Sequence, residues 1–250
     1  MLRSIKETQG YNIVARDEEF GKARDLLFDD EEWIVRYLVV DTGKWIPGKK
    51  VIIPPNQLGK PDWAERIFPV KMSQKAIIEG PALDADEPVS RRYEKKLHSF
   101  FGWNPYWLVG VPENVVMGQM THAEQESRGG ASENEPEPEE ETDLRSSDEV
   151  MGYHIHATDG SIGHVEDIIM DDEDWRIRYI VVDTRNWLPG KKVLVAVSWV
   201  HDIKWLDKEV YVDLDRVSIK DSPEYDPSAP INREYEEKLY DFYGRPRYWI

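Results

Sequence analysis

Two acidic residues at equivalent places in the chain carry the most suggestive catalytic pattern. Asp41-Thr42-Gly43 imitates the signature of aspartic proteases, and Asp183-Thr184-Arg185 repeats it without the glycine. That chemistry needs two carboxylates that share a proton, so a hydrolase would use Asp41 and Asp183. However, Asp and Thr side chains also form hydrogen bonds with backbone N–H groups of the turn where a strand ends. We therefore expect no enzyme and no catalytic residue, and a hydrolase is the least favoured alternative.

Three histidines suggest a different chemistry, the binding of a divalent metal. His154 and His156 are two residues apart and so share one face of a strand, while His164 returns on the next strand across the Asp159-Gly160 turn. The equivalent positions in the first half of the chain are Asn12, Val14 and Lys22. A metal-responsive module using the three histidines stays an alternative. Solvated or partner-facing histidines are the simpler interpretation, so we assign no metal ligand and no cofactor.

Aromatic side chains are abundant and gather at the end of each half of the chain. The 250 residues include ten Trp and twelve Tyr, and large aromatic side chains contribute strongly to protein interfaces. The same side chains could instead cover their own domain. The candidate interface residues are Tyr93, Phe100, Phe101, Trp103, Trp107, Tyr235, Phe242, Tyr243 and Trp249.

Composition excludes several other functions. The chain has no cysteine, which rules out disulfides, zinc-thiolate sites and thiol nucleophiles. No apolar run approaches the roughly 18 residues needed to span a bilayer, and the first nine residues are too polar for a signal peptide. Basic residues form only short clusters, such as Lys49-Lys50 and Lys191-Lys192. We therefore expect a cytoplasmic protein that neither binds nucleic acid directly nor inserts into a membrane.

An internal repeat organises these residues. Residues 10–107 align with residues 152–249 at a constant offset of 142, with 38 identities over 98 positions. A period this long exceeds the 20 to 50 residues of solenoids, so each copy should own a core. Between the copies the sequence becomes acidic, with six Glu and two Pro in Glu133–Glu141. The predicted domains are residues 1–110, a flexible acidic linker at 111–151, and residues 152–250.

Charge is distributed unevenly among these parts. The net charge is −17, but residues 1–107 contain 17 basic and 17 acidic side chains, whereas residues 152–250 contain 13 and 20. More than half of the excess acid lies between the copies. We expect the linker to be mobile and to act as a tether, or as an acidic lure for a basic partner surface.

Hydrophobic periodicity predicts the elements of each copy. In the second copy, short stretches with period two predict six strands, at residues 153–157, 162–170, 175–183, 193–197, 201–206 and 209–214. A helix should follow, with Asn232 as its N-cap and Gly244 as its stop; Ser90 and Gly102 play these parts in the first copy. Closely spaced antiparallel strands favour a small barrel.

The strand pattern resembles a known family. Residues 177–184, continuing to Trp187 through Leu194, resemble the PRC-barrel domain, and residues 35–53 resemble it equally. The resemblance implies a mainly β fold of two six-stranded antiparallel barrels, each followed here by a short amphipathic helix. It also implies a docking or assembly role without family-wide catalytic residues. We expect the copies to pack as a pseudo-dimer that binds a protein partner, whose identity and pathway the residues do not name.

Overall fold

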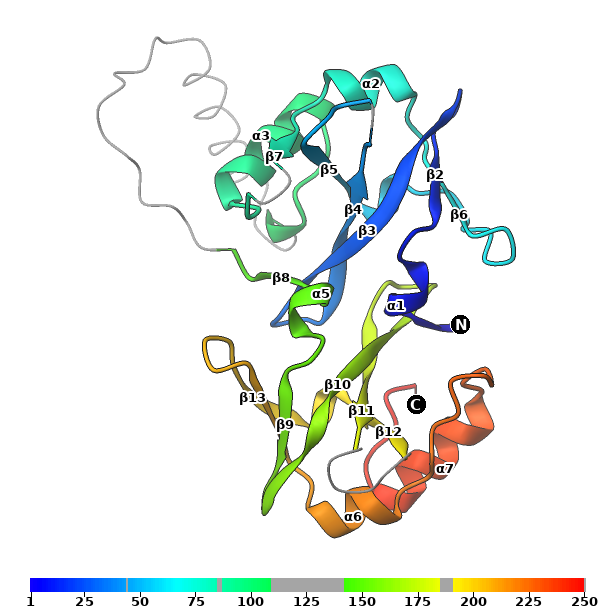
Figure 1. Cartoon of the computed structure of the whole chain (residues 1–250), viewed down its shortest axis with the longest axis vertical. Helices are drawn as coiled ribbons and strands as arrows, with labels where there is room; N and C mark the ends of the chain where they lie inside the picture. Colours follow the sequence, from blue (N-terminus) through cyan, green and yellow to red (C-terminus); the bar gives the residue numbers. More distant parts are fainter. Residues whose placement is uncertain (44, 85–86, 109–141, 185–190, 250) are drawn as a thin grey trace, which may run out of the picture.

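Two lobes stacked along the long axis make up the molecule, one for each repeat (Figure 1). The computed structural model describes residues 1–43, 45–84, 87–108, 142–184 and 191–249. Each lobe is built on a seven-stranded sheet. The N-terminus lies where the lobes meet (Figure 1). No helix in these described ranges is long and apolar enough to cross a membrane.

The first sheet holds the strands of the first repeat and one strand from beyond it. Its order is β6-β2-β3-β4-β5-β7, and β8 pairs with β3 outside this path. The bounds are β2 (Asn12–Val14), β3 (Glu19–Asp29), β4 (Ile34–Asp41), β5 (Lys49–Ile53), β6 (Ile67–Pro69), β7 (Leu83–Asp84) and β8 (Leu144–Ser146). β3 and β4 are rich in apolar residues, and their ladder runs from Lys22 opposite Asp41 to Asp29 opposite Ile34.

The second sheet repeats this plan, with order β12-β11-β10-β9-β14-β13 and β1 paired with β10. Its strands are β1 (Leu2–Ser4), β9 (His154–Ala157), β10 (Gly160–Asp171), β11 (Ile177–Asp183), β12 (Lys192–Ala196), β13 (Val200–Lys204) and β14 (Glu209–Val212). The six strands predicted for this repeat are therefore all present.

The expectation of purely antiparallel six-stranded barrels needs correction. β9 pairs with β14 in parallel, as β2 does with β6. Each sheet has seven strands, and in the described residues the strand order runs from one edge to another without closing. The physical reason is that β9 pairs with the last strand of its repeat as well as with its sequence neighbour β10. Short spacing along the chain does not reveal such long-range pairing.

The seventh strand of each sheet comes from the other half of the chain. β1 lies antiparallel to β10, with Leu2 opposite Asp171, and β8 lies antiparallel to β3, with Leu144 opposite Asp29. The exchange is reciprocal. A further bridge between Ile34 and Arg176 lies midway, because these two residues are equivalent under the repeat offset. The repeats are therefore joined about a pseudo-two-fold axis, and buried apolar residues of both contribute to one continuous core.

This exchange corrects the end of the predicted linker. The structure places β8 and the short helix α5 (Ser147–Val150) within residues 142–151, which the sequence analysis assigned to the linker. They match β1 and α1 (Ile5–Thr8), and Leu2-Arg3-Ser4 recurs as Leu144-Arg145-Ser146 at the same offset of 142. The predicted properties of residues 109–141 lie outside the described residues.

Helices close each repeat. α2 (Gln74–Glu79) and α3 (Arg91–Phe101) belong to the first repeat, and α6 (Arg216–Asp221) and α7 (Arg233–Tyr243) to the second. The predicted caps are confirmed: the side chains of Ser90 and Asn232 accept hydrogen bonds from helix N–H groups. Gly102 and Gly244 end α3 and α7 in the left-handed conformation, with φ of 66° and 60°.

Candidate functional site

The junction between the repeats is held by two equivalent polar clusters around aspartates. Ser146 and Ser147 donate hydrogen bonds to Asp25, at 2.6 Å each, and the backbone N–H of Asp148 donates another at 3.1 Å. The counterpart carboxylate, Asp167, accepts from the Ser4 hydroxyl at 2.5 Å and the Lys6 N–H at 3.1 Å. Each aspartate thus binds the start of the other repeat.

Burial at the junction has an electrostatic cost. The pKa of Asp25 is raised because burial disfavours the charged carboxylate, and the hydrogen bonds from the two serines oppose this shift. The pKa of Asp167 is raised for the same reason. A carboxylate that is partly desolvated depends on its donors, so these clusters fix the register of the exchanged strands.

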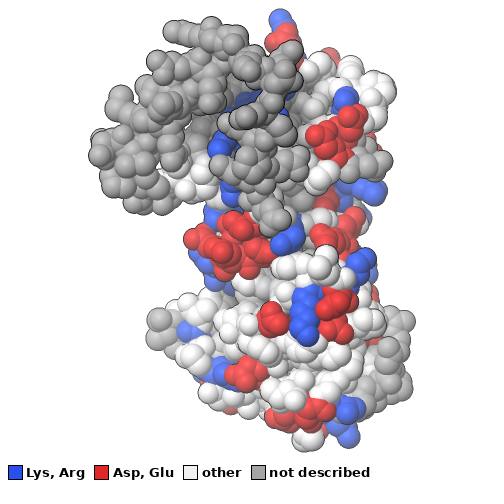
Figure 2. Space-filling model, turned by 90° about the vertical axis from the view of Figure 1, so that its left-hand side faces the viewer, with Lys and Arg blue, Asp and Glu red and all other residues white. Residues whose placement is uncertain are grey.

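Cationic side chains extend the junction outward. Arg3 pairs with Asp172 at 3.1 Å and its guanidinium lies 4.5 Å from the centre of the Trp63 ring. The equivalent Arg145 pairs with Asp30 at 2.8 Å and lies 4.3 Å from the centre of the Trp205 ring. On the face shown in Figure 2, acidic and basic side chains are interspersed around the waist between the lobes. The pairing of opposite charges on exchanged strands favours the observed register.

Beneath each terminal helix lies a buried glutamate. Glu94 is 0% exposed and accepts hydrogen bonds from the hydroxyls of Tyr37, at 2.9 Å, and Tyr106, at 3.0 Å. Arg91 lies 2.8 Å from its other oxygen. Burial raises the pKa of Glu94, against the opposing influence of Arg91 and the tyrosines. This cluster ties together strand β4, helix α3 and the chain after it.

The same cluster recurs in the second repeat. Glu236 is 3% exposed and accepts hydrogen bonds from Tyr179 at 2.7 Å and Tyr248 at 2.8 Å, and Arg233 lies 3.0 Å away. Both oxygens of each glutamate are therefore engaged by the protein itself. A buried carboxylate with these partners links the helix to the sheet. Because it is buried and already paired, it is poorly placed to accept a proton from a substrate as a general base.

The nine candidate interface residues separate into two groups. Tyr93 is buried, and six more pack partly buried against their own cores: Phe101, Trp103, Trp107, Tyr235, Tyr243 and Trp249. Phe100 and Phe242, which occupy equivalent positions, are 54% and 44% exposed. Most of the aromatic tail thus covers its own repeat, and the exposed remainder is one phenylalanine on each terminal helix.

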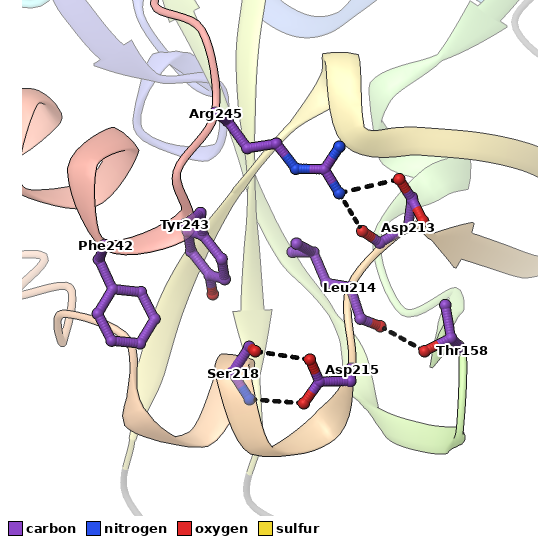
Figure 3. A pocket seen from close by; sticks show the side chains of 8 residues that line it. All are labelled: Thr158, Asp213, Leu214, Asp215, Ser218, Phe242, Tyr243 and Arg245. Atoms are coloured by element: carbon purple, nitrogen blue, oxygen red, sulfur yellow. Dashed lines mark hydrogen bonds and ion pairs between the residues drawn. The ribbon is translucent and has the colours of Figure 1, made fainter.

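A small open pocket borders Phe242. It has a volume of about 330 Å³, and Figure 3 shows its lining: Thr158, Asp213, Leu214, Asp215, Ser218, Phe242, Tyr243 and Arg245. Arg245 donates to Asp213 at 2.8 Å, and Ser218 donates to Asp215 at 2.6 Å from its hydroxyl and 2.9 Å from its N–H. These carboxylates already have partners, so the pocket offers a polar recess beside an exposed aromatic ring.

The three histidines do not form one common metal site. His156 pairs with Glu209 at 3.3 Å and stacks on Tyr211. His164 instead lies with Glu166 and Asp183, and one ligand atom from each falls within 4.8 Å of the others. Sequence analysis assigned His164 and Asp183 to different hypotheses, and Glu166 was overlooked. Lys6 and Lys192 also reach Glu166, at 3.1 and 3.3 Å, and compete with any cation there.

The two aspartates of the hydrolase hypothesis are not brought together. β4 and β11 start side by side at the Ile34–Arg176 bridge and run in opposite directions from it. Asp41 and Asp183 end these strands, seven residues from the bridge on each side, so roughly 45 Å of strand separates them at about 3.3 Å per residue. The Asp41 carboxylate accepts from the N–H of Gly43 at 2.9 Å, as expected of a turn residue.

Sequence reasoning missed the junction serines and the buried glutamates. A signal for both was present in the repeat. The identical Leu-Arg-Ser segments before Gly10 and Gly152 extend the duplication to the exchanged strands. Glu94 and Glu236 are also identical between the repeats, each directly after a tyrosine of the terminal helix. The partners of these residues, however, come from distant parts of the chain.

Comparison with known families agrees with this duplicated architecture. The model of the PRC-barrel domain matches the chain twice, at residues 2–71 and 148–219. The first match covers β1, α1 and strands β2 to β6, and the second covers most of α5 and strands β9 to β14. A search among curated proteins finds no significant match.

Proposed function

The chain belongs to the PRC-barrel domain family, and we propose that it is a non-enzymatic interaction or assembly module with two repeats packed as a pseudo-dimer. The observation that carries the proposal is the reciprocal exchange of β1 and β8. Five hydrogen bonds from the exchanged segments to Asp25 and Asp167 join the repeats in addition to the backbone ladders. Such a junction holds two related surfaces in one fixed orientation.

A fixed orientation is valuable for assembly. When two binding surfaces belong to one rigid body, the second contact with a multivalent partner is intramolecular and needs no new ordering of the repeats. Phe100 and Phe242 are the exposed members of the aromatic clusters and recur in equivalent places. Exposed aromatic residues are frequent anchors of interfaces. They are therefore the residues that we assign to partner contact.

Affinity purification from the source cell tests this function. We expect the tagged chain to retain specific proteins that the folded Phe100→Ala/Phe242→Ala double variant loses, as quantified by mass spectrometry. Leu206→Ala is the matched control, because Leu206 is 100% exposed but lies in the β13–β14 turn. Retention of the same proteins by the double variant and the wild type would assign the interaction to another surface. Absence of any enriched protein would oppose the proposal.

A metal-responsive module is the second candidate, favoured by the proximity of His164, Glu166 and Asp183. Titration calorimetry with zinc chloride tests it. Binding heat that disappears in His164→Ala but persists in His201→Ala would support this function. The absence of heat from the wild-type chain at neutral pH would reject it, which is the result that the lysines beside Glu166 lead us to expect.

A further inference from the structure

The contacts that join the two repeats would suit two identical repeats equally well. Both exchanged strands read Leu-Arg-Ser, and the carboxylates that receive them also recur at the offset of 142. The equivalent contacts are Ser4–Asp167 with Ser146–Asp25, and Arg3–Asp172 with Arg145–Asp30. By these contacts alone, a repeat could pair with the same repeat of a second chain. Selection of the partner within one chain therefore needs residues that differ between the repeats.

One part of the junction differs between the repeats in the sign of its charges. Lys6 lies in α1, and its ammonium group is 3.1 Å from the carboxylate of Glu166 on β10. The equivalent residues under the offset are Asp148 in α5 and Arg24 on β3. The first repeat thus carries two cations here, and the second repeat carries two anions. We call Lys6, Arg24, Asp148 and Glu166 the junction charges; α1 and α5 lie at the waist between the lobes (Figure 1).

Asp148 takes the place of Lys6 in the backbone contacts as well. Its N–H donates to Asp25 at 3.1 Å, and Arg24 directly precedes this aspartate in β3. Both Arg24 and Asp148 are exposed. The Asp148 carboxylate accepts a hydrogen bond from the side-chain amide of Gln9, so Arg24 acts on it by charge from a longer distance. Each of the two contacts between unlike repeats therefore brings a cation toward an anion.

Pairing of like repeats would bring like charges together instead. If two first repeats exchanged strands, Lys6 of each chain would face Arg24 of the other. Two second repeats would place Asp148 beside Glu166 in the same way. Because every contact occurs twice in a two-fold arrangement, either pairing contains two repulsions where the observed fold contains two attractions. Like charges that meet at an interface disfavour the wrong partner.

Two further features of the junction bear on this selection. Lys192 lies 3.3 Å from Glu166 and recurs as Lys50. In a pairing of first repeats, Lys50 would add a third cation to the repulsive group. In a pairing of second repeats, Lys192 would offset part of the repulsion, but the bridge of Ile34 with Arg176 would become one of Arg176 with Arg176. Both like pairings are therefore opposed by charge.

We propose that the junction charges select the partner of each repeat. They favour closure of one chain on itself, through unlike repeats, and oppose the exchange of strands with the same repeat of a second copy. Attractive and repulsive charges are combined in the same way where coiled-coil helices choose their partners. The proposal rests on the reciprocal exchange that the proposed function also uses, but it involves no other protein.

Three charge-exchange variants of the full-length chain test the proposal, and none of them changes the net charge. Variant A, Lys6→Glu/Asp148→Lys, exchanges the signs on α1 and α5. Variant B, Arg24→Glu/Glu166→Lys, exchanges them on β3 and β10. In both variants unlike repeats repel at the junction and like repeats attract. Variant C combines all four substitutions and restores the attraction between unlike repeats.

The masses after refolding report which repeats pair. Each protein is unfolded in urea, refolded at about 100 µM in low salt, and measured by light scattering. The wild type and variant C should be single chains of 29.2 kDa. Variants A and B should raise the ratio of dimer to monomer by about tenfold or more, because exchange between chains restores all their attractions. Added salt should reduce this ratio, since it screens exposed charges beyond about 10 Å at 0.1 M.

A matched control separates the junction from charge exchange in general. Lys75→Glu/Glu79→Lys exchanges an exposed pair in α2, whose ionic groups lie 3.7 Å apart, and should leave the chain monomeric. Circular dichroism and thermal unfolding check that every variant is folded. A dimeric wild type, variants A and B that refold as single chains, or a variant C as dimeric as they are would each overturn the proposal. These masses do not depend on the proteins retained through Phe100 and Phe242, so this test and that of the proposed function fail separately.

Discussion

At the scale of single residues, Gly21 and Gly163 show how closely neighbouring strands approach. A Cβ atom at Gly21 would lie 2.3 Å from the carbonyl oxygen of Asp41, and one at Gly163 would lie 2.0 Å from that of Asp183. In both cases the obstacle is backbone rather than a flexible side chain. The identity of these glycines in both repeats is therefore explained by packing at the ends of β4 and β11.

We predict that Gly21→Ala lowers the free energy of unfolding by about 3 kcal/mol, because the strand must move to relieve the clash. Gly10→Ala is the control, since Gly10 has a φ of 78° but no atom within 4 Å of its added Cβ. It should cost about 1 kcal/mol, the usual penalty of a left-handed alanine. Urea unfolding measures both, and equal losses would contradict the steric explanation.

The buried Glu94 predicts a pH dependence. Its folded-state pKa is raised above its ordinary value of 4.5, so between that value and the folded-state pKa the folded protein binds more protons than the unfolded chain. The contribution of Glu94 to stability therefore falls as the pH rises through this window. Glu94→Gln removes that titration. The stability of the variant relative to the wild type should increase with pH from 4.5 upward.

Urea unfolding of Glu94→Gln and the wild type at several pH values measures the difference between their free energies of unfolding. The contributions of the other titrating groups are the same in both proteins and cancel in this difference. Glu79→Gln is the control, because Glu79 is exposed and its ion pair with Lys75 is long, at 3.7 Å. Its stability relative to the wild type should vary little with pH. A Glu94→Gln difference that stays flat or decreases with pH would show that burial of Glu94 does not raise its pKa.

At the scale of elements, the terminal helices were predictable and the strand pairing was not. Ser90, Gly102, Asn232 and Gly244 mark the helix ends by local hydrogen bonding and backbone conformation, which a sequence displays directly. β1 pairs with a strand at least 165 residues away in the sequence, and β8 pairs with one at least 115 residues away, so no local pattern encodes their placement. For the same reason, His164 and Asp183 became neighbours although they came from separate hypotheses.

The cap of α3 gives a prediction at this scale. Ser90→Ala removes the hydroxyl that accepts from the N–H of Tyr93 at 3.2 Å, and should cost about 1 kcal/mol. Ser99→Ala, an exposed change within the same helix, should be neutral or slightly stabilising, since alanine is the better helix former. Thermal unfolding of both variants measures the difference. Equal melting temperatures would mean that α3 does not depend on its cap.

At the scale of the whole molecule, the two repeats of one chain pack with the reciprocal contacts of a symmetric dimer. In a symmetric dimer the exchanged strands would come from two identical subunits, and every contact would occur twice. Here the paired contacts of Asp25 and Asp167 are equivalent but not identical, because Lys6 in one becomes Asp148 in the other. Fusion allows the two halves to diverge, as the junction charges have done.

The central claim is that the exchanged strands, rather than the segment between the repeats, hold the two halves together. Its most direct test is to insert a protease site between residues 125 and 126, cut the folded chain, and measure the mass in solution by light scattering. We expect both pieces to remain in one complex of about 29 kDa, the mass of the intact chain of 29.2 kDa. Separation into two species of about half that mass would contradict the claim.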